Sequence, residues 1–265
     1  MSLKIETLEV SATEAGSVLT DLTRRRLDDL RRLRAVTRED IGHVCGTPSA
    51  ANQFIDAARK NGWLVPTGWG DYKVPDRATH DLMIHLPNSP LRQLAAWATI
   101  LREHAGRPIA FAAPRIIRET DLNETRPIPV VLLDPSDDIE HGTPPRWDAF
   151  QLDAQKPEKW RLSVKGKGHV DLLGLALRDV VLLLRASRDP RWGMAARQLE
   201  ARHGAAPVVS DNLPRVESPQ LALRGNKTRS IGLGPPHRRR LFAPPWYMDM
   251  LRHSLYPVYG GPSDA

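Results

Sequence analysis

Two capped helix starts that lie ten residues apart constrain the fold more than any other feature of the chain. Thr37 and Asp40 have the spacing of a capping box, although that box prefers Glu or Gln at the position of Asp40. Gly46 ends the first short helix, and Thr47 is a second N-cap, followed by Pro48 at the first helical position. The sequence therefore predicts two helices joined by a tight turn.

The second helix has one apolar face and one polar face. Its apolar face is formed by Ala51, Phe54, Ile55 and Ala58, and Asn61–Gly62 ends it. A step of 100° per residue then turns four polar side chains outward. They are Ser49, Asn52, Gln53 and Asp56.

The segments that flank this pair of helices predict a small domain around it. Residues 12–35 predict a long helix, with arginines between its regularly spaced leucines. Residues 63–65 and 72–74 are β-prone and are joined by a loop rich in Pro and Gly, which predicts a hairpin. Long helix, short helix, tight turn, capped helix and hairpin is the order of a winged helix-turn-helix.

The rest of the chain predicts a larger mixed domain. Helices are expected at 91–104, 108–122, 170–186 and 193–203, and strands at 128–133, 148–152 and 159–164. A Pro-rich basic C-terminal segment follows, in which residues 241–258 could dock as a helix. The fold class expected is α+β, with an N-terminal winged helix-turn-helix domain at 1–80 and a mixed α/β domain at 81–265.

Charge is unevenly distributed along the chain. The formal net charge is +7, yet residues 1–80 contain 12 Lys and Arg against 11 Asp and Glu. Residues 221–256 contain 7 Lys and Arg against Asp249 alone. A basic excess is common in proteins that bind nucleic acids. The lack of a long apolar run and of a secretion signal, with Cys45 as the one cysteine, predicts a cytoplasmic protein without a membrane partner.

These patterns predict a set of residues that contact double-stranded DNA. Asn52 and Gln53 can each pair with adenine, Ser49 can serve several bases, and Asp56 would repel phosphates. The other candidates are expected at the DNA backbone or on the hairpin. They are Arg24, Arg25, Arg26, Arg59, Lys60, Trp69, Lys73, Arg238, Arg239 and Arg240. The alternatives are that these residues form ordinary solvated faces, or that the winged helix binds only protein.

The layout of the chain resembles that of the AbiEi antitoxins, the regulator half of AbiE abortive-infection toxin–antitoxin systems. The resemblance rests on the predicted winged helix, the strand PVVLLDPSD, the run VDLLGLALRDVVLLLRA and the basic segment HRRRLFAPPWYMDMLRHSL. It implies a repressor that binds repeats in its own promoter, possible homodimers on DNA, and neutralisation of a nucleotidyltransferase-like toxin. It also implies base reading by Ser49, Asn52 and Gln53.

No complete catalytic constellation is visible in the sequence. Residues 165–169, KGKGH, lack the spacing of a phosphate-binding loop and predict a basic turn before a helix. The histidines show no metal-ligand spacing, and Cys45 predicts a small buried residue. We therefore expect no catalytic residue, no metal and no cofactor. An enzyme that acts on nucleotides or nucleic acid, with the winged helix as a targeting module, is the alternative.

Overall fold

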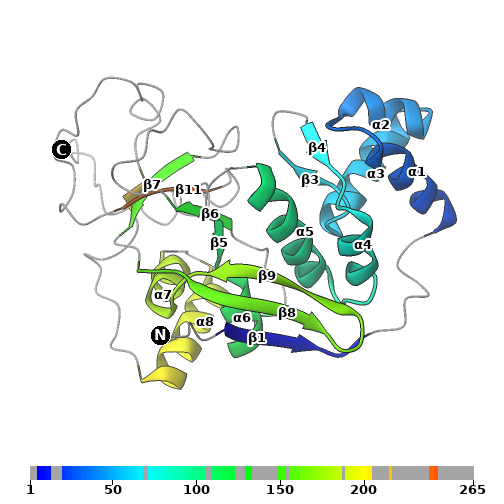
Figure 1. Ribbon diagram of the computed structural model, residues 1–265. Helices are drawn as coiled ribbons and strands as arrows, with labels where there is room; N and C mark the ends of the chain where they lie inside the picture. The colour runs from blue at the N-terminus through cyan, green and yellow to red at the C-terminus, as the bar shows by residue number, and fades with distance from the viewer. Residues whose placement is uncertain are drawn as a thin grey trace, which may run out of the picture. The chain divides into compact units, whose positions relative to one another are not determined.

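The chain forms two compact units that both mix helices and strands (Figure 1), which confirms the α+β class. The computed structural model describes residues 5–12, 20–67, 71–104, 109–122, 129–132, 148–152, 155–186, 189–204, 215–216 and 239–243. The first unit contains Met1–Gly106 and Lys159–Leu172, and the second contains Arg107–Glu158 and Leu173–Ala265. The sequence placed a boundary at residue 80, whereas the first unit continues to Gly106.

Three helices near the start of the first unit begin at side-chain caps. Helix α1 (Asp21–Arg31) begins after Thr20, and α2 (Arg38–Cys45) begins after Thr37. Asp40 completes the predicted capping box, because the backbone N–H of Thr37 donates to its Oδ2 at 2.8 Å. Helix α3 (Pro48–Lys60) begins after Thr47, and its buried residues are the four that the sequence predicted: Ala51, Phe54, Ile55 and Ala58.

A three-stranded sheet accompanies these helices. Its strands are β2 (Val36–Thr37), β3 (Val65–Pro66) and β4 (Asp71–Lys73), in the order β2-β4-β3. Both pairings are antiparallel, with Val36 opposite Tyr72 and Val65 opposite Lys73. The predicted hairpin is confirmed as β3 and β4, and β2 adds a third strand that the sequence analysis did not identify.

Two further helices complete the helical part of this unit. Helix α4 (Arg77–Met83) is short, and α5 (Ser89–His104) confirms the helix predicted at 91–104. The start of α5 lies against the end of α3, because Gln93 Nε2 donates to the carbonyls of Arg59 (3.2 Å) and Lys60 (2.8 Å). These bonds satisfy backbone acceptors that the last turn of a helix leaves open.

Strands from distant parts of the chain also belong to the first unit. Strand β1 (Ile5–Val10) pairs in parallel with β8 (Glu158–Val164), with Leu8 opposite Leu162. Strand β9 (Gly168–Gly174) is the next neighbour of β8, and its last two residues belong to the second unit.

In its described residues, the second unit combines short strands with three helices. From the end of β9 its strand order is β5 (Ile109–Phe111), β6 (Pro129–Leu132), β11 (Arg239–Ala243), β7 (Asp148–Leu152) and β10 (Arg215–Val216). The helices are α6 (Ala113–Glu119), α7 (Leu177–Arg185) and α8 (Pro190–His203). Their apolar residues, among them Ile116, Leu182 and Leu199, form one buried cluster.

Several predicted helices are wrong over part of their length. Residues 109–111 and 170–174 are strands, and helix begins only at Ala113 and Leu177. Short apolar runs are ambiguous between buried strand and buried helix, which explains both errors. The helix predicted at 12–35 starts at Asp21, residues 11–12 are not helical, and 13–19 lie outside the described residues. Of the helix predicted at 241–258, residues 241–243 belong to β11 and the others lie outside the described residues.

The end of α3 provides a test of its packing against α5. Gly62 and Gly46 both have left-handed backbones, with φ of 77° and 81°. A Cβ on Gly62 would lie 2.9 Å from the carbonyl oxygen of Arg92, whereas a Cβ on Gly46 would meet nothing within 4 Å. We expect Gly46→Ala to lower the free energy of unfolding by about 1 kcal/mol, and Gly62→Ala by about 3 kcal/mol. Urea unfolding followed by circular dichroism measures both, and equal losses would contradict the close approach of α5.

Candidate nucleic-acid interface

Helices α2 and α3 are joined by a turn of only two residues, Gly46 and Thr47. Gly46 adopts the left-handed conformation, and its N–H donates to the carbonyl of Gly42 at 2.9 Å. A residue without a Cβ takes this conformation at no steric cost. The turn therefore holds the two helices in a fixed relation and leaves the start of α3 at the surface.

The polar face of α3 is exposed along its whole length. Pro48 and the four predicted outward residues, Ser49, Asn52, Gln53 and Asp56, are exposed, as are Arg59 and Lys60. This confirms the orientation that the helical periodicity predicted. The face offers amide and hydroxyl groups in its first two turns and cations in its last, the order in which base edges and phosphates would be met.

Arg38 adds a cation to this face that the sequence analysis did not identify. It is the first residue of α2, and its Nη2 donates to Oδ1 of Asn52 at 2.5 Å. Both side chains are exposed. No sequence signal links residues 14 positions apart on different helices; the short turn at Gly46 brings them together.

The arginines of α1 differ in their exposure to solvent. Arg24 and Arg25 are exposed, as a role at phosphates requires. Arg26 is only partly exposed, and its guanidinium carbon lies 5.9 Å from the centre of the Phe54 ring. This cation–π contact fastens α1 to α3, so the structure gives Arg26 a role in packing that the sequence did not predict.

The hairpin candidates are described only in part. Lys73 lies in β4, opposite Val65, and its side chain is half-buried. Trp69, expected at the tip, lies outside the described residues.

The three arginines of the basic tail belong to the second unit. Arg239 and Arg240 lie in β11, opposite Leu152 and Gln151 of β7, and Arg238 lies outside the described residues. Helix α3 belongs to the first unit.

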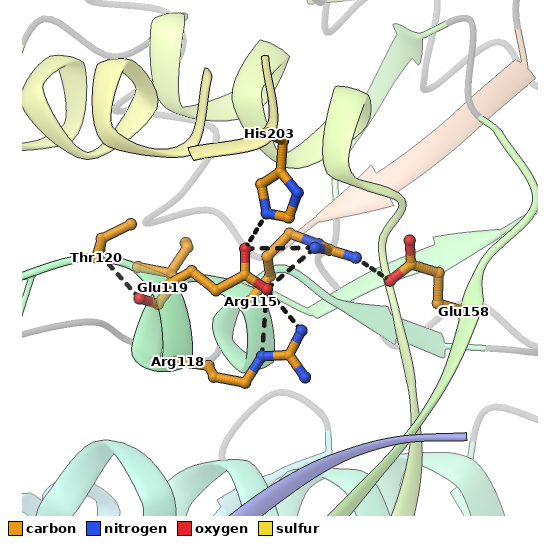
Figure 2. A network of polar contacts seen from close by, with 7 residues as sticks. Arg115, Arg118, Glu119, Thr120, Glu158 and His203 are labelled. Atoms are coloured by element: carbon orange, nitrogen blue, oxygen red, sulfur yellow. Dashed lines mark hydrogen bonds and ion pairs between the residues drawn. The ribbon is translucent and has the colours of Figure 1, made fainter. Parts of the chain in front are cut away.

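A separate cluster of charged residues lies in the second unit (Figure 2). The buried carboxylate of Glu119 accepts from Arg115 Nη1 at 3.1 Å, Arg118 Nη2 at 2.7 Å and His203 Nε2 at 2.5 Å. Arg115 also pairs with Glu158. The cluster therefore ties α6 to the last turn of α8 and to the start of β8.

The cluster keeps Glu119 ionised. Burial alone would raise the pKa of this carboxyl, but hydrogen bonds from His203 and Arg118 and the charge of Arg115 outweigh burial and hold the pKa below its usual range. A carboxylate with both oxygens engaged and a lowered pKa is poorly suited to act as a general acid near neutral pH. The arrangement is that of a structural ion cluster.

The remaining chemical candidates occupy ordinary structural positions. Cys45 is buried, as predicted, and burial raises the pKa of its thiol. Lys165 and Lys167 are exposed in the turn between β8 and β9, and His169 is exposed in β9 itself, so this basic turn precedes a strand rather than the predicted helix. A phosphate-binding loop requires a helix start at that point, which removes the main support for a nucleotide site.

The described part of the chain contains no group of three His, Cys, Asp or Glu side chains arranged to hold a metal ion. It also contains no helix with the length and hydropathy needed to cross a membrane.

Comparisons with known proteins find none that is similar to this chain. No family model, no curated protein and no solved structure gives a significant match. Any functional conclusion therefore rests on the residues and their geometry.

The Glu119 cluster generates a stability prediction. Glu119→Gln removes the charge of one of the two carboxylates that Arg115 contacts and of the carboxylate that Arg118 and His203 share, and we expect a loss of about 3 kcal/mol in the free energy of unfolding at pH 7. Asp171→Asn is the control, since it breaks the more exposed Arg161–Asp171 pair (2.7 Å) and should lower the free energy of unfolding far less. Thermal and urea unfolding of the full chain measure both.

The pH dependence of this loss tests its electrostatic origin. A lowered folded-state pKa means that Glu119 stabilises the protein fully above the ordinary glutamate pKa and ceases to do so as the pH falls through the folded value. The difference between wild type and Glu119→Gln should therefore shrink below about pH 4. A difference that stays constant from pH 7 down to pH 3 would show that the carboxylate's charge is not what stabilises the cluster.

Proposed function

We propose that the first unit carries a winged helix-turn-helix that binds duplex DNA, and that the chain is a transcriptional repressor. One observation carries the proposal. The order α1-β2-α2-α3-β3-β4, with the sheet order β2-β4-β3 and a two-residue turn between α2 and α3, matches the layout of that motif. In it the second helix of the pair enters the major groove.

The exposed face of α3 supplies the chemistry for base reading. Ser49, Asn52 and Gln53 occupy the first two turns, and the early residues of a recognition helix are the ones that reach base edges. Arg59 and Lys60 follow in the last turn, where they can contact phosphates. In this proposal strands β3 and β4 form the wing, and Lys73 of β4 contacts the sugar-phosphate backbone.

The charge balance of this region predicts moderate rather than strong non-specific affinity. Asp56 lies on the same face as Asn52 and Gln53 and opposes phosphate. Arg24, Arg25, Arg59 and Lys60 are the exposed cations that we assign to phosphates. If each neutralises one phosphate, the logarithm of affinity should fall with the logarithm of salt concentration with a slope of about −3 to −4.

The repressor role predicts specific binding to the promoter that precedes the gene. We expect Gln53→Ala to weaken binding of the full chain about tenfold to hundredfold on that duplex and to relax preference at one base pair. Arg59→Ala should instead weaken binding to all duplexes alike. Fluorescence anisotropy with promoter and scrambled duplexes measures both effects.

Arg77→Ala is the matched control, because Arg77 is exposed on α4 outside the proposed interface. Its affinity should equal that of the wild type. A wild-type chain that does not distinguish the promoter from the scrambled duplex at low salt would refute sequence-specific repression.

We further propose that the chain is the antitoxin of an AbiE-like pair. The support is the resemblance of its sequence layout to the AbiEi antitoxins, which implies a nucleotidyltransferase-like toxin as partner. The alternative is an enzyme that acts on nucleotides or nucleic acid; the KGKGH segment, one of the features that motivated it, runs from the turn after β8 into β9 rather than into a helix.

The antitoxin role is tested by co-expression. A neighbouring reading frame that arrests growth on its own should be tolerated when the full chain is produced with it, and the Gln53→Ala variant should protect equally well. Equal protection is expected because toxin neutralisation does not need base reading. Growth arrest that persists at equal protein levels would refute the antitoxin role without affecting DNA binding.

A further inference from the structure

The contact between Arg38 and Asn52 restricts which base the α3 face can read. Arg38 begins α2, Asn52 lies in the second turn of α3, and the Gly46–Thr47 turn holds these positions together. Nη2 of Arg38 donates to Oδ1 of Asn52 at 2.5 Å. Within the described residues neither side chain has another hydrogen-bond partner.

The chemistry of the two groups settles the orientation of the amide. A guanidinium has five N–H donors and no acceptor, so the amide atom that it meets must be the oxygen of Asn52. That bond uses one of the two lone pairs of the Asn52 carbonyl oxygen, which is the only acceptor among the two side-chain groups. The groups that remain are therefore mostly donors: the other N–H groups of Arg38 and the NH₂ of Asn52.

We propose that Arg38 and Asn52 act together as a guanine-reading pair, an inference that rests on the proposed DNA binding. Guanine presents two acceptors, N7 and O6, in the major groove, and a set of donors complements them. Adenine presents an acceptor beside a donor, and its N6 amino group would face the N–H donors of Arg38, while the Asn52 oxygen that could accept from it already accepts from Arg38. In this proposal Asn52 reads guanine rather than adenine, and Arg38 is a specificity-determining residue.

The bond to Asn52 also has an energetic consequence for Arg38. A free arginine loses considerable rotamer entropy when it is ordered at an interface. Asn52 holds the guanidinium before DNA arrives, so part of this ordering precedes binding. Asn52 thus acts both as a donor and as the residue that positions Arg38.

The experiment is selection of duplexes from a randomised library by the full chain. Wild type, Arg38→Ala, Arg38→Lys, Asn52→Ala and the double variant are compared for base preference at each position. We expect a guanine in the wild-type motif whose preference falls about tenfold to hundredfold in each single variant. Arg38→Lys keeps the charge but loses the two-pronged donor, so it should bind non-specific duplex as wild type does and still lose the guanine.

The double variant and a phosphate-type control separate cooperation from charge. If the two residues act as a unit, the double variant should lose no more preference than either single one. Arg59→Ala should weaken binding to every duplex and keep the guanine. Thermal unfolding confirms that the variants are folded, which is expected because both positions are exposed.

The outcomes distinguish this inference from the proposed function. Enrichment of a motif whose bases are unaffected by Arg38→Ala and Asn52→Ala would overturn the guanine pair and leave DNA binding intact. Uniform weakening by Arg38→Ala, with a salt slope reduced by about one, would likewise overturn it, by showing a phosphate contact. If the wild type enriches no sequence, the proposed function fails, and the guanine pair fails with it.

Discussion

The packing of α2 on α3 across the Gly46–Thr47 turn is the constraint on which the rest of the first unit depends. Gly46 has a left-handed backbone and Thr47 is the N-cap of α3, so no residue between the two helices is free to change their arrangement. The buried face of α3 therefore packs against α2, and its polar face points outward. The same turn sets the first residue of α2 beside the second turn of α3. The exposed base-reading candidates and the Arg38–Asn52 contact are both consequences of this one junction.

The two ends of α3 differ in their hydrogen-bond partners. At its C-terminal end Ser89 and Gln93 of α5 bind the carbonyl of Lys60, and Gly62 passes close to Arg92. At its N-terminal end the Thr47 side chain caps the backbone N–H of Ala50, and Pro48, Ser49, Asn52 and Gln53 are exposed. A helix anchored at its C-terminal end and on its buried face can present the polar face of its first turns to a ligand while it stays rigid.

The sequence predicted those parts of the fold that depend on local chemistry. The caps at Thr37 and Thr47, the buried face of α3 and the strand at 148–152 needed only neighbouring residues, and all are confirmed. Strand β1 was missed because its partner β8 lies some 150 residues away in the chain. The sequence predicts helix at residues 170–174, because an apolar run does not show that its residues pair in a sheet. Arg26 on Phe54 and Arg38 on Asn52 were missed because no local pattern reports a side-chain contact between helices.

Fewer cations are available to bind a polyanion than the number of Lys and Arg residues in the chain suggests. Arg92 and Arg115 are held in internal contacts, with Asn61 and with Glu119, and Arg185 pairs with Glu200. Arg26 lies against an aromatic ring. With general attraction limited in this way, an interface built on α3 must discriminate through the few groups that reach base edges. The geometry of Asn52 and of the arginine that orients it then matters more to specificity than the net charge of +7.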